Sequence, residues 1–369
     1  MRLMLTGGGT GGHLYPGLAI AEEMERRVTC QIIFVGTKHG VEAKVVPDKG
    51  YRFRKVWISG FHRRRMWRNA LFPLKVAVSF VQALFIVLSF QPDVIVGTGG
   101  YVSWPVLAAG LLTRKKIVLQ EQNYKPGVVT RLMAPYAKSV HLSFENSKTF
   151  FWRISNLRVS GNPTRKELDV PCRDGDYAYF GLDAGKTTLF VLGGSQGARA
   201  VNEAVIKLMG GLMKREDVQI LWAAGPRWSE RVKKETEVYG NRVHVFPYIE
   251  EMGMAYCVSD IVICRAGATT VAELTRIGLP AVFIPLPGAA GGHQAENARV
   301  LKEAGAAEIV LEQEMDGGKL LEAVSRLLDD SEIRGAMGRI AKEFGRFDAA
   351  RLIVDDILLM LKYEAVLSC

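Results

Sequence analysis

The chain has 369 residues, a length typical of two domains. It is 48% hydrophobic and 23% charged, which excludes a disordered, collagen-like or disulfide-scaffold protein. The net charge is +10, but residues 1–165 carry 24 basic and 8 acidic side chains, whereas residues 166–369 carry 24 and 30. A cationic first half indicates an anionic partner: nucleic acid, an anionic membrane surface or a phosphorylated ligand.

The cysteines and the N-terminus indicate a compartment. The 5 cysteines include no C-x-x-C pair, so we expect neither a disulfide framework nor a structural zinc site, and a reducing compartment is favoured. Met1–Leu5 leads directly into glycines and does not resemble a signal peptide. The sequence therefore predicts a cytoplasmic protein.

The first half alternates predicted strands and helices. An apolar run, Leu3–Thr6, leads into a glycine loop, Gly7–Gly12, and then into an amphipathic segment, Pro16–Arg27. Further apolar runs predict strands at Gln31–Gly36, Val94–Val96, Lys116–Leu119 and Ser139–Leu142. This alternation predicts a parallel, doubly wound sheet.

One apolar segment, Ala70–Phe90, does not fit this alternation. It follows a stretch of cationic and aromatic residues: Arg52, Arg54, Lys55, Trp57, Arg63, Arg64, Arg65, Trp67 and Arg68. A spanning helix needs about 20 apolar residues, and Pro73, Lys75 and Gln82 interrupt this run. A helix half-buried in a membrane interface is favoured, and a core helix beside a solvated basic loop is the alternative.

The second half repeats the pattern of the first. A strand at Thr188–Leu192 leads into a second glycine loop, Gly193–Ala198, and a helix over Arg199–Met213. Further predicted strands are Gln219–Ala223, Val243–Val245, Ile261–Cys264 and Ala281–Ile284. We expect an α/β protein of two Rossmann-like domains, 1–162 and 163–347, with a helix at about 348–369 packing back on the first.

The first glycine loop contains G-x-G-x-x-G and ends in His13. A nicotinamide site also needs an acid at the end of the next strand, but the residues there are Val35-Gly36-Thr37-Lys38. We therefore expect close approach of a sugar or a pyrophosphate rather than a dinucleotide. His13 lies where such sheets bind ligands, and its position is equally compatible with a general base and a helix cap.

Several loops of the second half point to a nucleotide-sugar ligand. Ser195 and the surrounding glycine N–H groups are suited to phosphate, and so is the helix start within Arg265–Glu273. Glu273 is suited to ribose hydroxyls and Gln294 to sugar hydroxyls. The alternative is that Thr269 or Thr270 caps the helix that begins within Arg265–Glu273. In the first half, Glu121 is a second candidate base.

Other classes lack their motifs. The sequence has no G-x-x-x-x-G-K-[ST], no H-E-x-x-H, no clustered metal ligands and no nucleic-acid-binding motif. We expect no nucleic acid partner, no cofactor and no essential metal.

The ordered set of motifs resembles the MurG family of peptidoglycan glycosyltransferases. The motifs are G-G-G-T-G-G-H, G-T-G-G-Y, E-Q-N, G-N-P-x-R, G-G-S-Q-G-A, R-A-G-A-T-T-V-A-E and H-Q-x-x-N-A. The resemblance implies a GT-B fold, an active site in the cleft between the domains, and transfer of N-acetylglucosamine (GlcNAc) from UDP-GlcNAc to lipid I, which gives lipid II. It also implies a peripheral protein on the cytoplasmic face of the membrane, an anionic lipid surface as a partner, and other cell-wall synthesis proteins as possible partners.

The resemblance also assigns residues. Donor binding is expected at Thr10, Gly11, Gly12, Asn123, Arg165, Ser195, Ile249, Ala268, Thr269, Thr270, Val271, Glu273 and Gln294. Acceptor binding is expected at Gly9, Thr98, Gly99, Gly100 and Tyr101. His13 is the first choice of base for an inverting transfer and Glu121 the second. The alternatives are another GT-B glycolipid glycosyltransferase, a UDP-GlcNAc 2-epimerase and a non-catalytic UDP-sugar-binding protein.

Overall fold

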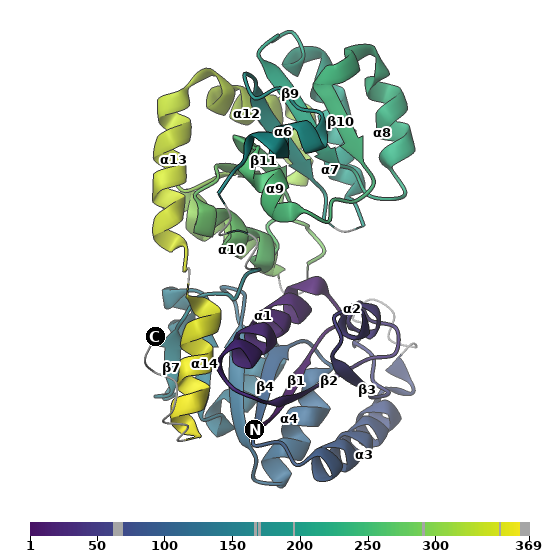
Figure 1. Cartoon of the computed structure of the whole chain (residues 1–369), viewed down its shortest axis with the longest axis vertical. Helices are drawn as coiled ribbons and strands as arrows, with labels where there is room; N and C mark the ends of the chain where they lie inside the picture. The colour runs from purple at the N-terminus through teal and green to yellow at the C-terminus, as the bar shows by residue number, and fades with distance from the viewer. Residues whose placement is uncertain are drawn as a thin grey trace. The chain divides into compact units, whose positions relative to one another are not determined.

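The computed structural model describes residues 1–61, 69–165, 168, 171–194, 196–289, 292–346 and 348–361. The chain divides into two units (Figure 1): unit 1 is Met1–Thr164 with Arg346–Cys369, and unit 2 is Arg165–Gly345. Some residues with expected roles lie outside the described residues: Arg63, Arg64, Arg65, Trp67, Arg68, Ser195 and the end of the expected C-terminal helix, 362–369.

Unit 1 contains a seven-stranded parallel sheet in the order β3-β2-β1-β4-β5-β6-β7. Its strands are β1 Arg2–Gly7, β2 Gln31–Gly36, β3 Arg52–Lys55, β4 Val94–Gly99, β5 Lys116–Glu121, β6 Ser139–Leu142 and β7 Leu157–Val159. Its helices are α1 Gly11–Arg27, α2 Glu42–Asp48, α3 Phe72–Phe90, α4 Ser103–Leu112, α5 Val128–Met133 and α14 Ala349–Met360. Consecutive strands connect through helices, as a parallel sheet requires.

Helices cover both faces of this sheet. Leu3 and Leu5 of β1 belong to one buried cluster together with residues of α1 and α14. Met4, between them, belongs to a second cluster with residues of α3 and α4. Successive side chains of a strand point to opposite faces, so the continuous apolar run of β1 supplies both cores.

Helix α3 is largely exposed although it is strongly apolar. Ser79, Ala83 and Val87 are its buried residues, whereas Phe85 is 70% exposed. By length and composition α3 could cross a membrane, and 17% of its apolar stretch is buried. It packs beside α4 and against the sheet of unit 1.

Unit 2 contains a six-stranded parallel sheet in the order β10-β9-β8-β11-β12-β13. Its strands are β8 Thr187–Leu192, β9 Val218–Ala223, β10 Val243–Phe246, β11 Ile261–Cys264, β12 Ala281–Phe283 and β13 Glu308–Ile309. Its helices are α6 Asp174–Phe180, α7 Arg199–Leu212, α8 Ser229–Thr236, α9 Met252–Cys257, α10 Ala268–Ile277, α11 His293–Glu303, α12 Lys319–Asp329 and α13 Ser331–Phe344. The predicted α/β class with two Rossmann-like sheets is confirmed.

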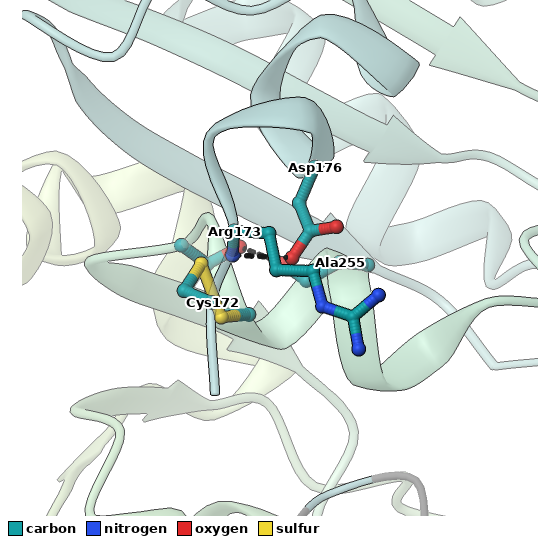
Figure 2. Close-up of a disulfide and its surroundings, with 6 residues drawn as sticks. Cys172, Arg173, Asp176 and Ala255 are labelled. Carbon is teal, nitrogen blue, oxygen red and sulfur yellow. Dashed lines mark hydrogen bonds between the residues drawn. A yellow bond between two sulfur atoms is a disulfide. The ribbon is translucent and has the colours of Figure 1, made fainter. Parts of the chain in front are cut away.

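One covalent contact corrects the sequence analysis. The structure joins Cys172 to Cys257 in a disulfide (Figure 2), whereas we expected none. The two cysteines are 85 residues apart, so their spacing gave no signal, but the fold brings their Cα atoms to 5.4 Å. The carboxylate of Asp176 lies near both sulfur atoms and accepts the backbone N–H of Arg173 at 2.9 Å.

Candidate active site

Each sheet has a point at which its strand order reverses. The reversal falls between β1 and β4 in unit 1 and between β8 and β11 in unit 2. Doubly wound sheets bind ligands outside the carboxyl ends of the strands at this point. The predicted residues follow these strands: His13 and Thr98–Tyr101 in unit 1, and Gly193–Ala198 and Arg265–Thr270 in unit 2. The fold therefore gathers them at two candidate ligand edges.

His13 lies in the first turn of α1 and is held by the carboxyl end of β4. Its Nδ1 is 3.0 Å from the backbone carbonyl oxygen of Thr98. Since a carbonyl oxygen only accepts, Nδ1 of the neutral imidazole carries the proton, and Nε2 keeps the lone pair that a base needs. The Thr98 hydroxyl in turn donates to the backbone oxygen of His13 at 2.6 Å.

Two glycines pack directly against the His13 ring. A Cβ added at Gly99 would lie 3.0 Å from Nδ1, and one at Gly100 would lie 3.2 Å from Cδ2. Both glycines also have positive φ, +96° and +80°, which other residues rarely adopt. The G-T-G-G-Y motif therefore lets the loop after β4 lie against the imidazole.

The first glycine loop is tied to a carboxylate that the sequence analysis missed. Glu42 is buried, and its Oε2 accepts the backbone N–H of Gly9 at 3.0 Å. Its Oε1 accepts both the N–H and the hydroxyl of Thr37, at 2.9 and 2.8 Å. Thr10 precedes α1, and its carbonyl accepts the backbone N–H of His13.

The remaining predicted residues of unit 1 lie beside these two loops. The Tyr101 ring lies over Gly9, and burial together with the negative charge of Glu42 raises the pKa of Tyr101. Glu121 ends β5 with its carboxylate buried. That carboxylate accepts the N–H and the side-chain amide of Asn123 and the N–H of Gly127. Glu121 therefore holds the loop after β5 in shape.

Unit 2 has a cavity of about 700 Å³ at its ligand edge. It is lined by the second glycine loop, by Gly267 and Thr270 at the start of α10, and by Gln294 at the start of α11. Helices α7, α10 and α11 all begin at this cavity, and none has a side-chain hydrogen bond at its N-cap. Free N–H groups and the positive ends of helix dipoles bind anions, so the cavity is suited to phosphate groups.

Thr269 lies in the first turn of α10, next to Thr270, which lines the cavity. Within the described part of the chain, its buried Oγ1 has no hydrogen-bond partner. A hydroxyl left unpaired in a folded protein costs about 1–3 kcal/mol, which a ligand oxygen would offset. Ala268 and Val271 of the same turn are buried.

Glu273, one turn farther into α10, is buried and doubly paired. Its Oε1 accepts from Arg165 Nε at 2.7 Å, and its Oε2 accepts from the Tyr256 hydroxyl at 2.9 Å. The structure thus brings together two predicted donor residues, Arg165 and Glu273, and adds Tyr256, which no motif indicated. Burial and the charge of Glu273 raise the pKa of Tyr256 well above its usual value.

Other residues complete the edge of unit 2. Gln294 lines the cavity, and its Oε1 accepts the N–H of Leu286 at 2.9 Å. Ile249 follows β10 and is buried. Arg265, which lines the cavity and was not predicted, pairs with Glu312 at 2.5 Å. The pair leaves little net positive charge there, so the helix ends are the main anion-binding groups.

Comparison with known proteins identifies the class that these two units define. The N-terminal domain model of glycosyltransferase family 28 matches residues 3–142, and its C-terminal domain model matches residues 188–353. Unit 1 and unit 2 are thus the two domains of a glycosyltransferase, and the expected GT-B fold is confirmed.

A relative from Chlorobaculum tepidum is 43% identical over 367 residues, 98% of this chain and 100% of its own length. It is a UDP-N-acetylglucosamine–N-acetylmuramyl-(pentapeptide) pyrophosphoryl-undecaprenol N-acetylglucosamine transferase. The chain therefore belongs to this family of transferases, the MurG family, and the resemblance read from its motifs is confirmed.

Solved structures agree with this assignment. MurG of Acinetobacter baumannii has a TM-score of 0.77 and 28% identity, covering 97% of this chain and 99% of that one. The UDP-GlcNAc 2-epimerase of Neisseria meningitidis bound to UDP-GlcNAc has a TM-score of 0.68 at 13% identity, covering 97% of this chain and 100% of that one. At that identity the second likeness shows the fold alone.

Proposed function

We propose that this enzyme transfers GlcNAc from UDP-GlcNAc to the C4 hydroxyl of the muramoyl sugar of lipid I, with inversion at the anomeric carbon. The observation that carries the proposal is the 43% identity, over the whole chain, to a transferase named for this donor and this lipid-linked acceptor. The products are UDP and lipid II. The likeness to the epimerase extends only to the fold, so it does not favour that alternative.

The donor binds in the cavity of unit 2. Its diphosphate lies at the start of α10, where Thr269 offers an unpaired hydroxyl and the N-cap residue Gly267 supplies no side-chain hydrogen bond. The ribose binds at Glu273, whose oxygens each have a second lone pair beside the bonds from Arg165 and Tyr256. The GlcNAc hydroxyls accept from the Gln294 amide, and the backbone at Ile249 contacts uracil. Ser195 adds a phosphate contact in this assignment.

The acceptor binds at unit 1, against Gly9, Thr98–Gly100 and Tyr101. Nε2 of His13 takes the proton from the C4 hydroxyl as its oxygen attacks the anomeric carbon, and the bond from that carbon to the UDP oxygen breaks. The negative charge that develops on UDP is stabilised by the helix ends of unit 2. The contacts of Glu121 with Asn123 and Gly127 support a structural role for that carboxylate, so we assign the base to His13.

The enzyme binds the cytoplasmic face of the membrane peripherally through the α3 face, which we define as Leu74, Val81, Phe85 and Leu88. These side chains are 47–70% exposed. The cationic residues Arg52, Arg54 and Lys55 of β3 are exposed in the same unit. An apolar helix face with cationic residues binds anionic membranes by burial of apolar area and by charge attraction.

Vesicle sedimentation tests the membrane surface. We expect binding to phosphatidylglycerol vesicles that falls with added salt and with Phe85→Glu. Val238→Glu in unit 2, at a position 83% exposed, is the matched control and leaves binding unchanged. If Phe85→Glu sediments like the unmodified protein, the α3 face is not the membrane surface.

Release of UDP from UDP-GlcNAc tests the reaction. We would measure it with a lipid I analogue, with diacylglycerol and without acceptor. We expect release that depends on the lipid I analogue and a product in which GlcNAc is linked to the muramoyl sugar. Release with diacylglycerol alone would make the enzyme another glycolipid glycosyltransferase. No acceptor-dependent release would contradict the proposed transfer.

A further inference from the structure

A row of buried polar side chains crosses unit 1 and ends at His13. Asn162, Gln120, Gln122 and Thr98 are each at most 4% exposed, and β4, β5 and the segment after β7 position them. Gln120 Nε2 donates to Asn162 Oδ1 at 3.1 Å, and Gln122 Nε2 donates to Gln120 Oε1. Buried amides are unfavourable unless they are hydrogen-bonded, so a continuous row of them needs a reason.

The hydrogen-bond partners of Gln122, the last amide in this row, determine its orientation. Gln122 Nε2 lies 2.6 Å from the backbone oxygen of Thr98, which only accepts, so this end of the amide is the NH₂ group. The other end, Oε1, then lies 3.1 Å from Nδ1 of His13. An amide oxygen only accepts, so His13 Nδ1 has two acceptors, Gln122 Oε1 and Thr98 O, and no donor facing it among these contacts.

We propose that Gln122 is a positioning residue for His13, an inference that rests on the proposed role of His13 as the base. With Thr98 O, it holds the imidazole in the tautomer that carries its lone pair on Nε2. Both acceptors also stabilise the imidazolium that forms when Nε2 takes the acceptor proton, because hydrogen bonds to a charged group are stronger than neutral ones.

The neighbouring residue shows why the amide, and not the adjacent carboxylate, has this role. Glu121 and Gln122 are consecutive, yet the Glu121 carboxylate bonds the loop at Asn123 and Gly127 while the Gln122 amide faces His13. Among the described residues, the other titratable groups near His13 include Glu42, which bonds the glycine loop, Tyr101 on the loop after β4, and Tyr15 of α1, whose ring lies against Gly11. A neutral amide orients the imidazole without adding a charge beside the anionic acceptor.

Gln122→Leu tests the proposal by its effect on kcat and on the pH profile. A hydrogen bond to a charged group is worth a factor of about ten to one hundred, so we expect kcat to fall about tenfold or more. The imidazolium loses a stabilising acceptor, so the acid limb of the kcat/KM profile shifts to lower pH by up to about one unit. KM for UDP-GlcNAc stays unchanged, because the donor binds at unit 2.

Gln219→Leu is the matched control. Gln219 is also a buried strand glutamine, and its amide bonds Asp183 and Thr188 in unit 2. Both variants lose stability from the same chemical change, but we expect the pH limb to move only in Gln122→Leu. An equal change of kcat and pH profile in the two variants would reduce Gln122 to a structural residue and overturn the proposal.

A double-mutant cycle separates this inference from the assignment of the base. In the His13→Ala background, Gln122→Leu should cause little further loss of kcat, because its effect acts through the imidazole. If His13→Ala lowers kcat strongly but Gln122→Leu lowers the residual rate of that variant by the same factor as in the unmodified enzyme, the positioning role fails and the base assignment stands. If His13→Ala keeps full kcat, both fail.

Discussion

The two glycine loops of the enzyme have the same local design and different surroundings. Each follows a central strand, β1 or β8, at the point where the strand order reverses, and each leads into a helix, α1 or α7. In a Rossmann-like unit this is the position at which backbone N–H groups bind phosphate. The two glycine loops differ in the contacts that they make in the structure.

The loop of unit 1 is filled by the protein itself. The Glu42 carboxylate bonds the N–H of Gly9, and a Cβ added at Gly8 would lie 2.5 Å from the carbon of that carboxylate. Thr37 contributes the remaining hydrogen bonds of Glu42, and Tyr101 covers Gly9 from the other side. A phosphate at the N–H of Gly9 would have to displace a buried anion, so we propose that this part of the loop supports His13.

The loop of unit 2 is open. Gly193, Gly194 and Gly197 line a cavity of about 700 Å³ together with the start of α10. Its helix ends are uncapped, and the buried hydroxyl of Thr269 has no partner among the described residues. Glu42, which is 33 residues from Gly9 in the sequence, therefore distinguishes the two loops. In the proposed function, the loop that Glu42 fills supports the catalytic His13, and the loop that lines the cavity binds the donor.

The largest effect that this comparison predicts is at His13. His13→Ala should lower kcat by about 10²–10⁴-fold, the usual contribution of a general base. Binding of UDP-GlcNAc, measured by calorimetry, should stay unchanged, since the donor groups belong to unit 2. A variant that keeps its kcat but loses donor binding would reverse the roles assigned to the two loops.

The sequence predicted the common part of the two units and missed what distinguishes them. Long apolar strands followed by glycine loops were found because burial on both faces leaves a continuous apolar run. β3 (Arg52–Lys55) was missed because it is a short edge strand with one apolar residue, and β13 (Glu308–Ile309) because it has two residues.

The sequence predicted those residues of the candidate site that belong to local motifs. His13 and the glycines after β4 stand at strand ends, so the pattern located them. Glu42 contacts Gly9 across 33 residues and Gln122 contacts His13 across 109, and no local pattern encodes such pairs. The Cys172–Cys257 disulfide was missed for the same reason.

The second prediction concerns Glu42, which fills the glycine loop of unit 1. In Glu42→Gln the single oxygen can keep its bonds to Thr37, but the NH₂ group then faces the N–H of Gly9, donor against donor. We expect a loss of about 2–3 kcal/mol in unfolding free energy, because a buried hydrogen bond to a charged group is replaced by an unpaired donor. We also expect a higher KM for the lipid acceptor at unchanged KM for UDP-GlcNAc.

Thr37→Val is the control for this substitution. It removes the hydroxyl bond to Glu42 and the acceptor of the Gly40 N–H, but it leaves the Gly9 contact, so it should cost about 1–3 kcal/mol and leave the acceptor KM unchanged. If both variants raise the acceptor KM equally, the bond to Gly9 has no special role in the loop.

The third prediction concerns α14, the helix that packs on α1 in unit 1. α14 packs on α1, and its Asp356 accepts from buried His141 at 3.1 Å and from Arg158 at 2.8 Å. Burial alone would raise the pKa of Asp356, but the hydrogen bond from His141 and the charge of Arg158 hold it below its usual value. A lowered carboxyl pKa contributes stability above the unfolded pKa, near 4, that is lost as the pH falls through the folded value.

Asp356→Asn should therefore cost about 2 kcal/mol of unfolding free energy at pH 7. Denaturant unfolding should show this difference shrinking as the pH falls below about 4, where the aspartate of the unmodified protein is also protonated. Asp348→Asn, in an exposed pair with Arg351, is the control and should change stability by less than about 1 kcal/mol. A pH-independent deficit would mean that the carboxylate charge is not what holds α14.

The smallest effect is expected at the open loop, and there binding and stability should change in opposite directions. Thr269→Val keeps the shape of the side chain and removes a buried hydroxyl that has no partner among the described residues. Unfolding free energy should stay the same or rise, because an unpaired polar atom is lost, while the KM for UDP-GlcNAc should rise about tenfold as the diphosphate loses one hydrogen bond. Thr275→Val in the same helix is the control: its hydroxyl bonds the Ala272 carbonyl at 3.2 Å, away from the helix start, so neither quantity should change in this way. A loss of stability in Thr269→Val without a change in donor KM would mean that the hydroxyl serves the fold, and the contrast between the two glycine loops would then rest on Glu42 alone.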